Sequence, residues 1–285
     1  MMKCFVLLLA VVGVVVAEES ILVDYHGRVG IPKAMMMKQA EAATDFDGAR
    51  IVGGSTANLG EHPYMVGLLI NLQSGHTSAC GASLVSNTRL LTAAHCWTTR
   101  NYWGTSLVAV LGSTRLFSGG VRVNSNNVQV HSSYNNANLN NDVAVIVIPH
   151  VAYTNSIGAI VLPSGLLEHM TYAGERAVTA GYGRTSDTGS SDDQLRHVAL
   201  TVIQNFECAN IYGTSSVINS NICTSGMARQ GPCTGDSGGP LVFTFSNVRY
   251  LIGITSFVAD RGCEALLPAG YARTTSFLAW IRARL

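Results

Sequence analysis

The sequence predicts an all-β fold, either a sandwich or a barrel, that ends in one short helix. Three observations predict it. From residue 51 onward, apolar runs of strand length alternate with segments rich in Gly, Asn, Ser and Thr, as in all-β sandwiches and barrels. No internal repeat of fixed period occurs in the chain. Its 285 residues, 47% of them apolar, are enough for one large or two small domains with a substantial core.

Residues 1–17 have the features of an export signal. Lys3 supplies a positive charge, residues 5–16 form an unbroken apolar run, and residues 15–17 offer small side chains for cleavage. The run is shorter than the roughly 20 residues that a membrane-spanning helix needs. A buried N-terminal helix is the alternative. No later stretch is long and apolar enough to cross a membrane, so we expect a secreted, extracellular protein with no membrane partner.

Residues 18–50 differ in composition from the rest of the chain. They contain two lysines and a run of three methionines but no cysteine, and they end in Arg50. The next four residues, 51–54, are Ile-Val-Gly-Gly. We expect residues 18–50 to be an activation propeptide, called the leader below, and residues 51–285 to be the mature domain.

Eight apolar runs predict the strands of this domain, because each is short and bounded by turn residues. The Asn- and Ser-rich residues 124–141 are expected to form a surface loop. Apolar residues at helical spacing in 275–285 predict one short amphipathic helix. The predicted strands are residues 64–70, 83–85, 107–111, 143–148, 177–180, 197–203, 241–245 and 250–255.

Charge and cysteine content limit the partners. Charged residues make up 12% of the chain and the net charge is +1, whereas nucleic-acid binding needs clustered Lys and Arg, so we expect no nucleic-acid partner. Six cysteines beyond the signal suggest three disulfides in an oxidising compartment, with the pairing left open. The competing interpretation, a metal site, lacks any CxxC or HExxH spacing, so we expect no metal or cofactor. The cysteines are Cys80, Cys96, Cys208, Cys223, Cys233 and Cys263.

The most specific segment is Gly-Asp-Ser-Gly-Gly at residues 235–239. A hydroxyl nucleophile needs a base beside it and an oxyanion site in front of it, and glycines let the backbone turn tightly around Ser237. The same pattern occurs in α/β-hydrolases, where the histidine follows the serine. The α/β-hydrolase order is excluded here, because the last histidine of the chain, His197, precedes Ser237. An order beginning with an acid would need an aspartate before His95, and those lie only in the leader. The remaining order is His, Asp, Ser.

His95 and Asp142 are the candidates for the first two positions. His95 lies in Leu-Thr-Ala-Ala-His-Cys, where small residues allow close backbone packing. Asp142 begins the apolar run Asp-Val-Ala-Val-Ile-Val-Ile, and a buried carboxylate needs a partner. Taken alone, the histidine is more often structural or solvated, and the aspartate could be a turn or cap residue.

Together these segments resemble chymotrypsin-family serine protease zymogens, and the whole chain looks closest to insect gut chymotrypsin- and elastase-like members. The resemblance covers residues 51–285. It implies two six-stranded antiparallel β-barrels, roughly 51–165 and 166–285, with the active site between them. The motifs that carry it are Ile-Val-Gly-Gly at 51–54, Thr-Ala-Ala-His-Cys at 92–96, Asn-Asp-Val-Ala at 141–144 and Gly-Asp-Ser-Gly-Gly-Pro at 235–240.

The resemblance also implies roles. Ser237 is the expected nucleophile, His95 the general base and then acid, and Asp142 the residue that holds the imidazole. The N–H groups of Gly235 and Ser237 are expected to form the oxyanion hole. Family pairing implies disulfides 80–96, 208–223 and 233–263.

Activation is expected at the bond after Arg50, which a trypsin-like protease can cut. The new α-ammonium of Ile51 would then pair with Asp236 inside the protein, which would neutralise an otherwise costly buried carboxylate. The alternative treats Asp236 as a turn residue.

Residues of the primary specificity pocket follow from the same resemblance: Gly231 at its base, with Val258 and Ala269 on its walls. An uncharged base disfavours cleavage after Lys or Arg. Val258 stands where a glycine usually keeps the slot open, which would favour small side chains. The loop after it is one residue longer than in vertebrate chymotrypsins, however, and this would displace the wall. We expect cleavage after Phe, Tyr or Leu, with an elastase-like preference as the alternative.

Several further expectations complete the prediction. The partners are protein or peptide substrates, an activating protease and proteinaceous inhibitors, and the protein is expected to be a monomer.

Residues 51–285 contain 13 arginines and no lysine. Arginine stays charged where lysine titrates, so this favours an alkaline digestive lumen over simple compositional bias. A non-catalytic homologue that binds partners, or a regulatory protease of narrow specificity, is the alternative function.

Overall fold

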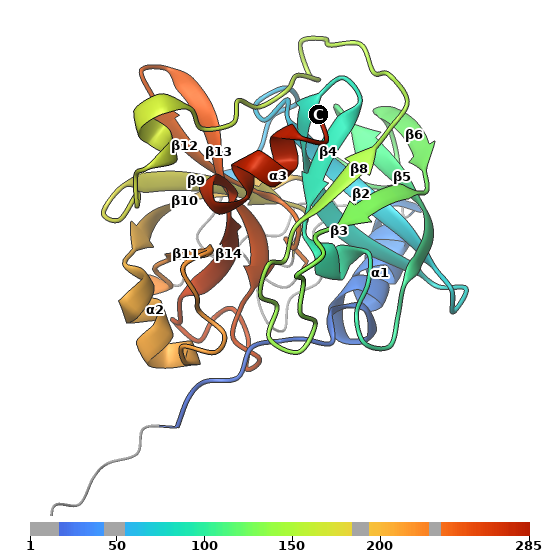
Figure 1. Ribbon diagram of the computed structural model, residues 1–285. Helices are drawn as coiled ribbons and strands as arrows, with labels where there is room; N and C mark the ends of the chain where they lie inside the picture. The colour runs from blue at the N-terminus through green and yellow to red at the C-terminus, as the bar shows by residue number, and fades with distance from the viewer. Residues whose placement is uncertain (1–16, 43–54, 184–193, 228–234) are drawn as a thin grey trace, which may run out of the picture.

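Two barrel-like antiparallel sheets lie side by side in the computed structural model, with the C-terminal helix α3 across their junction (Figure 1). The structure describes residues 17–42, 55–183, 194–227 and 235–285. The predicted all-β fold of two barrels with a short C-terminal helix is therefore confirmed. No helix in these described ranges is long and apolar enough to cross a membrane.

The first sheet has the order β6-β5-β2-β3-β4-β8-β7, and every neighbouring pair is antiparallel. Its edge strands, β6 and β7, follow each other directly in the chain, so one bent run joins the two ends of the sheet. The strands are β2 (Met65–Leu72), β3 (Thr77–Ser86), β4 (Arg89–Thr92), β5 (Gly104–Leu111), β6 (Val121–Ser125), β7 (Asn127–Val130) and β8 (Ala144–Val147).

The second sheet has the order β1-β10-β11-β14-β13-β12-β9, and an additional ladder between β9 and β10 closes six of its strands into a barrel. Strand β1 is added at β10, which ties the start of the mature domain to the second barrel. The strands are β1 (Ser55–Thr56), β9 (Arg176–Gly181), β10 (Arg196–Ile203), β11 (Asn221–Thr224), β12 (Pro240–Phe245), β13 (Val248–Phe257) and β14 (Ala269–Arg273).

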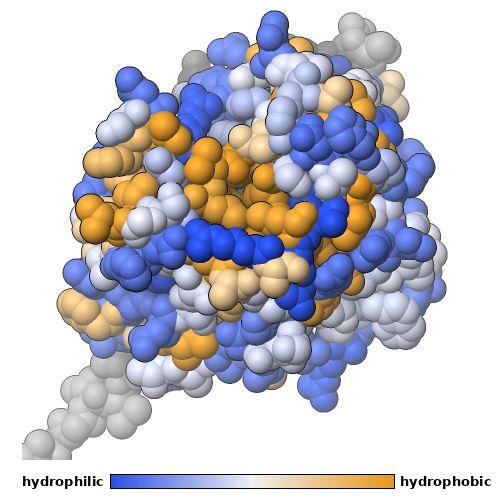
Figure 2. Space-filling model, turned by 45° about the horizontal axis from the view of Figure 1, so that its top comes forward, coloured by the Kyte–Doolittle hydropathy of each residue, from blue (hydrophilic) through white to orange (hydrophobic). Residues whose placement is uncertain are grey.

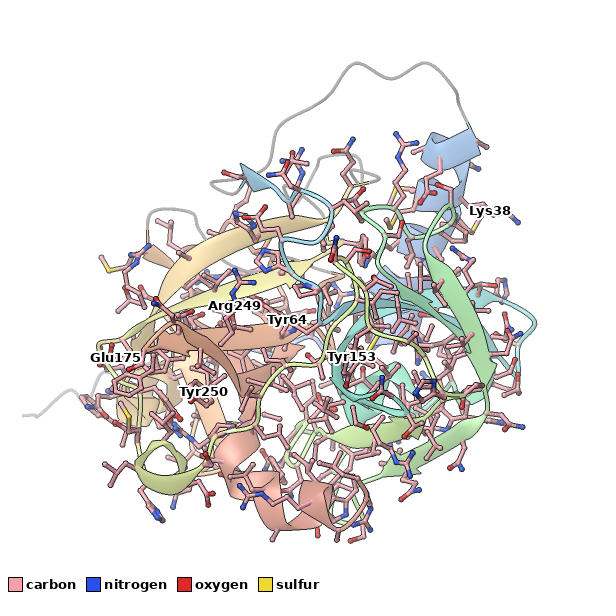
Figure 3. The ribbon with its side chains drawn as sticks, turned by 90° about the horizontal axis from the view of Figure 1, so that it is seen from above. Lys38, Tyr64, Tyr153, Glu175, Arg249 and Tyr250 are labelled. Atoms are coloured by element: carbon pink, nitrogen blue, oxygen red, sulfur yellow. A yellow bond between two sulfur atoms is a disulfide. The ribbon has the colours of Figure 1, made fainter. Side chains whose placement is uncertain are left out.

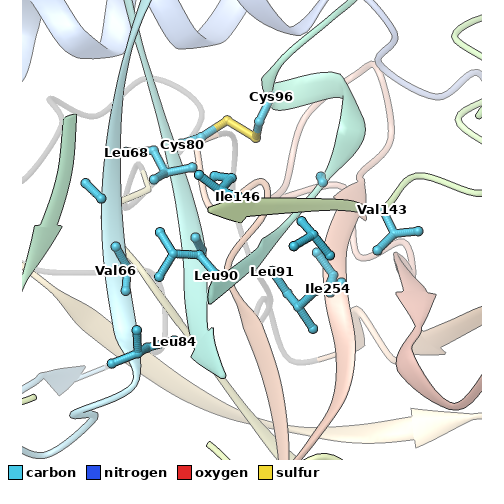
Figure 4. Close-up of a cluster of buried hydrophobic side chains, with 14 of the residues drawn as sticks. Val66, Leu68, Cys80, Leu84, Leu90, Leu91, Cys96, Val143, Ile146 and Ile254 are labelled. Carbon is cyan, nitrogen blue, oxygen red and sulfur yellow. A yellow bond between two sulfur atoms is a disulfide. The ribbon is translucent and has the colours of Figure 1, made fainter. Parts of the chain in front are cut away.

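Strand β2 shows how the sequence builds the core. Successive side chains of a strand point to opposite faces of the sheet. Val66, Leu68 and Ile70 point into the main core of the first barrel, which Figure 4 shows beside the Cys80–Cys96 disulfide. Met65 and Leu69 point outward and are also buried, in a second cluster that includes leader residues. The strand is apolar on both faces because both faces are covered.

Each of the eight predicted apolar runs falls on a strand of the structure. The predicted terminal helix is a 3-10 turn, Thr274–Phe277, followed by α3, Leu278–Arg282. The expected surface loop 124–141 was wrong in part, since β6 extends to Ser125 and Asn127–Val130 form β7. Polar residues suit an edge strand, and the ladder from β7 to β8 satisfies the backbone there.

Short helices occupy the connections and the leader. The connections hold the 3-10 turns η2 (Ala94–Cys96) and η3 (Gly165–Glu168), and helix α2 (Asn205–Tyr212). The leader forms a π-helical turn η1 (His26–Gly30) that runs directly into helix α1 (Ile31–Ala42). In Figure 1 the leader, coloured blue, runs along the underside of both barrels before it reaches α1. On the face shown in Figure 2, apolar side chains gather near the centre and polar ones surround them.

Candidate active site

The three residues predicted for catalysis come from three separate segments. His95 lies in the 3-10 turn η2, which follows β4 after Ala93. Asp142 lies two residues before β8, the strand that pairs with β4. Ser237 comes from the second barrel, in the loop before β12. The β4–β8 ladder brings the first two together, and the junction of the barrels brings the third.

Asp142 and His95 form a buried, doubly bonded pair. The Asp142 carboxylate accepts the backbone N–H of His95 at 2.9 Å on Oδ1, and lies 2.7 Å from Nδ1 of His95 through Oδ2. Both side chains are about 1% exposed. An ionised carboxylate can only accept hydrogen bonds. The proton of the neutral ring is therefore on Nδ1, and Nε2 carries the lone pair that a general base needs.

Ser256 is a third donor to this carboxylate. Its hydroxyl donates to Oδ2 of Asp142 at 2.6 Å, and both residues are buried. The sequence analysis did not identify this contact, because nothing local to residue 256 indicates that β13 ends beside Asp142. A carboxylate with three donors is held in one orientation.

The loop around Ser237 is fixed by its own backbone. The carbonyl oxygen of Ser237 accepts the N–H of Gly81 at 2.7 Å, and the N–H of Gly238 donates to Thr255 at 2.8 Å. Gly238 has φ +79°, and a Cβ there would lie 2.3 Å from the carbonyl oxygen of Gly81. Only glycine fits this close approach. The glycine that follows the serine in the motif is therefore required by packing between the two barrels.

Gly235 and Asp236 lie next to the candidate nucleophile. Gly235 has φ +109°, a conformation that favours glycine. The Asp236 carboxylate accepts the backbone N–H of Gly183 at 2.8 Å. The leader residue Lys33 lies close by, and its ammonium donates to the carbonyl oxygen of Gly235 at 2.5 Å. The predicted activation bond at Arg50 and Ile51 lies outside the described residues.

Disulfides hold the segments around the site. Cys80 of β3 is joined to Cys96, the neighbour of His95, and Cys208 of α2 is joined to Cys223 of β11. Cys263 is also disulfide-bonded. Its expected partner, Cys233, lies outside the described residues.

The walls of the predicted pocket are found beside Ser237. Residues 255–258, including Val258, line a small cavity with Ser237, and Ala269 is buried in the adjoining β14. The leader residues Leu22 and Tyr25 complete the lining and leave about 20 Å³, which is room for about one water molecule. Gly231, the predicted base, lies outside the described residues.

Two groups of side chains have the spacing of metal ligands. In the first, Cys80 and Cys96 are already joined in a disulfide, so they are not free to bind an ion. The second, also within the described residues, contains Glu61, His62 and His197 and no member of the triad. Here His62 Nε2 and His197 Nδ1 are 2.7 Å apart and share a hydrogen bond.

The charges around this second group do not favour a cation. Burial, His197 and Arg249 lower the pKa of His62 to about 4, against the opposing charge of Glu61. Arg249 also donates to the backbone carbonyl of Glu61. Figure 3 shows Arg249 near Tyr64, whose hydroxyl lies 3.1 Å from His62 Nδ1. The two imidazoles therefore have partners without a metal, and a positive charge already lies beside them.

A carboxylate, an imidazole and a hydroxyl placed between two β-barrels define a class of protein: the serine endopeptidases of trypsin-like fold. Comparison with known proteins agrees with that geometry. The trypsin family model matches residues 51–281. The chain therefore belongs to the trypsin family of serine proteases.

Individual relatives support the same assignment. Collagenase of Hypoderma lineatum is 39% identical over 82% of this chain and 86% of its own length. Brachyurin of Leptuca pugilator is 35% identical over 81% of this chain and 97% of its own. A solved structure of HL collagenase has a TM-score of 0.75 at 39% identity, and covers 82% of this chain and 98% of that one. The protein is a serine endopeptidase with insect relatives.

Proposed function

We propose that the protein is a secreted digestive endopeptidase, made as a zymogen that is cut between Arg50 and Ile51, which cleaves after Phe, Tyr or Leu. One observation carries the specificity. Leu22 and Tyr25 of the leader line the same small cavity as Ser237, beside the place where the side chain before a scissile bond would lie. A leucine and an aromatic ring thus already lie against the surface beside Ser237, which supports a preference for such side chains.

Each member of the triad has a role in this proposal. Ser237 attacks the scissile carbonyl, and His95 takes its proton and later gives it to the leaving amine. Asp142 holds the Nδ1–H tautomer of His95 and stabilises the imidazolium that forms. The backbone N–H groups of Gly235 and Ser237 stabilise the oxyanion. The two bonds from His95 to Asp142, both within 2.9 Å, support the orienting role.

The pocket walls favour apolar side chains. Val258 is half-buried and packs against the apolar cluster that contains Ala269 and Tyr271. The valine is therefore partly engaged with its own wall, and it lines the same cavity as Leu22 and Tyr25. The alternative is an elastase-like preference for small residues, in which Val258 would close the slot.

Activation depends on Asp236 in this proposal. Asp236 precedes Ser237 in the chain, and its carboxylate already accepts the N–H of Gly183. A buried carboxylate is stabilised by a cation, and the α-ammonium of Ile51 would supply one after the cut. The resulting pair would order the loop at Gly235 that forms the oxyanion hole.

A profile of cleavage sites tests the proposed specificity. The chain is activated with trypsin and given a peptide library, and the Ser237→Ala chain treated in the same way is the control. Cleavage after Phe, Tyr or Leu is expected. Cleavage after Ala or Val would establish the elastase-like alternative instead. No cleavage beyond the Ser237→Ala control would refute the proposed function. The Arg50→Gln chain should stay inert after the same treatment.

The proposed setting is an alkaline gut lumen. The export signal and the disulfides favour secretion, and the 13 arginines of residues 51–285 keep their charge at high pH. Similar chains include alkaline trypsin C of Manduca sexta, 34% identical over 85% of this chain and 93% of its own. Activity measured from pH 6 to pH 11 tests this, and a maximum at pH 7 that is lost by pH 10 would refute it.

A further inference from the structure

The leader lies in the candidate active site. Its residues 20–22 pair with the segment that follows β13. Ile21 forms an antiparallel bridge with Ala259, the N–H of Leu22 donates to Val258 at 3.3 Å, and the N–H of Asp260 donates to Ser20 at 2.8 Å. Added strands of this kind are a common way for proteins to bind extended peptides. Here the added strand leads directly to Ser237.

Tyr25 then lies beside both the candidate nucleophile and its base. Its ring packs edge-on against the His95 ring, with centroids 4.8 Å apart, and its hydroxyl donates to the carbonyl of Ala79 at 2.6 Å. Burial and the charge of Asp236 raise the pKa of Tyr25 far above its usual range, against an opposing hydrogen bond with the hydroxyl of Ser237.

In this docked state His95 lacks a hydrogen bond that catalysis would use. A phenol has one proton, and the proton of Tyr25 is donated to Ala79. Within the described part of the chain, the buried Nε2 of His95 has no hydrogen-bond partner. His95 is thus not bonded to the hydroxyl whose proton it would remove.

The leader leaves the extended conformation at the same point. Tyr25 has φ −62° and ψ −50°, which are helical values, and η1 begins at the next residue. An extended substrate would continue through the site, whereas the leader turns away into a helix. Residues 20–25 therefore occupy the site without presenting an extended scissile bond to Ser237.

Buried anchors hold the rest of the leader. Lys33 is 1% exposed, and its ammonium donates to Gly235, beside the negative charge of Asp236. Met37 of α1 is fully buried in the apolar cluster on the outer face of β2. The Glu41 carboxylate accepts three hydrogen bonds from residues 116–118, at 2.6–2.8 Å. In the docked state the leader thus buries apolar side chains and forms hydrogen bonds along 22 residues, from Ser20 to Glu41.

We propose that residues 18–42 have a function of their own, as a peptide inhibitor of this endopeptidase in which Tyr25 blocks Ser237 and Lys33 holds the loop at Gly235. The inference rests on the proposed role of Ser237 as nucleophile. Lys33 lies where the Ile51 α-ammonium is expected to act on Asp236. The cut after Arg50 therefore removes the covalent link to the inhibitor and supplies a competing cation.

The first test uses the full, uncut chain. The Arg50→Gln chain is treated with a fluorophosphonate, which labels an accessible nucleophilic serine, and the rate is compared with those of further variants in the same background. Truncating a buried aromatic anchor costs about 2 kcal/mol, or about 30-fold, so Tyr25→Ala should speed labelling of Ser237 by about 30-fold. Tyr25→Phe keeps the ring and should remain slow.

Lys38 provides a matched control. It lies on α1 five residues after Lys33 and is exposed, and Figure 3 shows it pointing away from the protein. Lys38→Met should label at the parental rate. Equal labelling of the parent and Tyr25→Ala chains, including no labelling of either, would overturn the block by Tyr25.

The second test adds the inhibitor from outside, so it does not depend on how a variant leader folds. A synthetic peptide of residues 18–42 is added to the trypsin-activated chain with a small chromogenic substrate. Competitive inhibition is expected, and Tyr25→Ala in the peptide should raise its inhibition constant by about 30-fold. No inhibition by the parental peptide at millimolar concentration would overturn the proposal. If the activated chain cleaved no substrate at all, the proposed function would fail, while the labelling test would still decide the role of Tyr25.

Discussion

Raising the pH from 8 to 10 is expected to tighten the docking of the leader through Lys33. Burial lowers the pKa of the docked Lys33 ammonium to about 8, although the charge of Asp236 opposes the shift. With the leader released into water, Lys33 has its ordinary pKa of 10.5. Between these values the released state binds more protons than the docked state. The docked state therefore gains stability as the pH rises through this window.

The magnitude follows from the two pKa values. They differ by about 2.5, which corresponds to about 3 kcal/mol over the whole window and about 40-fold in the docking constant between pH 8 and pH 10. Two other titratable groups of the leader, His26 and Tyr25, do not change the comparison between the parent and Lys33 variants. Burial and the charge of His95 lower the pKa of His26 to about 3. A released Tyr25 ionises near pH 10, which affects parent and Lys33 variants alike.

Fluorophosphonate labelling of the uncut Arg50→Gln chain measures this effect. At each pH, the labelling rate of this chain is divided by the labelling rate of the same chain carrying Lys33→Met. The division removes the contribution of His95 to the reactivity of Ser237, because that contribution is common to both chains. The ratio should fall by about 40-fold from pH 8 to pH 10, and the Lys38→Met chain should behave as the parent. A constant ratio, or one that rises with pH, would refute the reasoning from the buried ammonium.

Three further outcomes are expected. Ser256→Ala removes one donor from the Asp142 carboxylate. Since a hydrogen bond to a charged group contributes about 1.5–3 kcal/mol, kcat should fall by about tenfold or more with KM little changed. An unchanged kcat would contradict a role of Ser256 in holding Asp142. Gly238→Ala puts a Cβ 2.3 Å from the Gly81 oxygen at φ +79°, so the melting temperature and the activity should both fall, whereas a parental melting curve would contradict the packing. Replacing both cysteines of the disulfide beside His95 by alanine should lower the free energy of unfolding by about 2–4 kcal/mol, as measured by urea titration; an unchanged midpoint would show that the loop is held without it.

The docked leader gives the lysines of this chain a distinct place. Residues 51–285 contain none, while Lys33 is buried at the candidate oxyanion loop. A buried ammonium is unfavourable unless it is paired, and here it lies beside Asp236. The burial of Lys33 therefore indicates that the leader is docked, because in an undocked leader the ammonium would remain in water.

The fold class and the order of the candidate triad could be predicted from local features of the chain. Strand-length apolar runs repeat with turn residues between them, and each falls on a strand because this signal is local. The order His, Asp, Ser could be read because His197 is the last histidine and Ser237 lies beyond it. The small residues around His95 and Ser237 also indicated close backbone packing, which the contact of Gly81 with Ser237 shows.

Only the tertiary structure decided which distant groups meet. Ser256 reaches Asp142 across 114 positions of sequence, and Lys33 reaches Gly235 across 202. Strand β7 was predicted to be loop because its polar residues gain their hydrogen bonds from β8, which its own sequence does not reveal. The leader was expected simply to be cut away, since its composition carries no sign of the cleft it enters. Burial and hydrogen bonding are properties of two surfaces brought together, so one segment's residues cannot specify them alone.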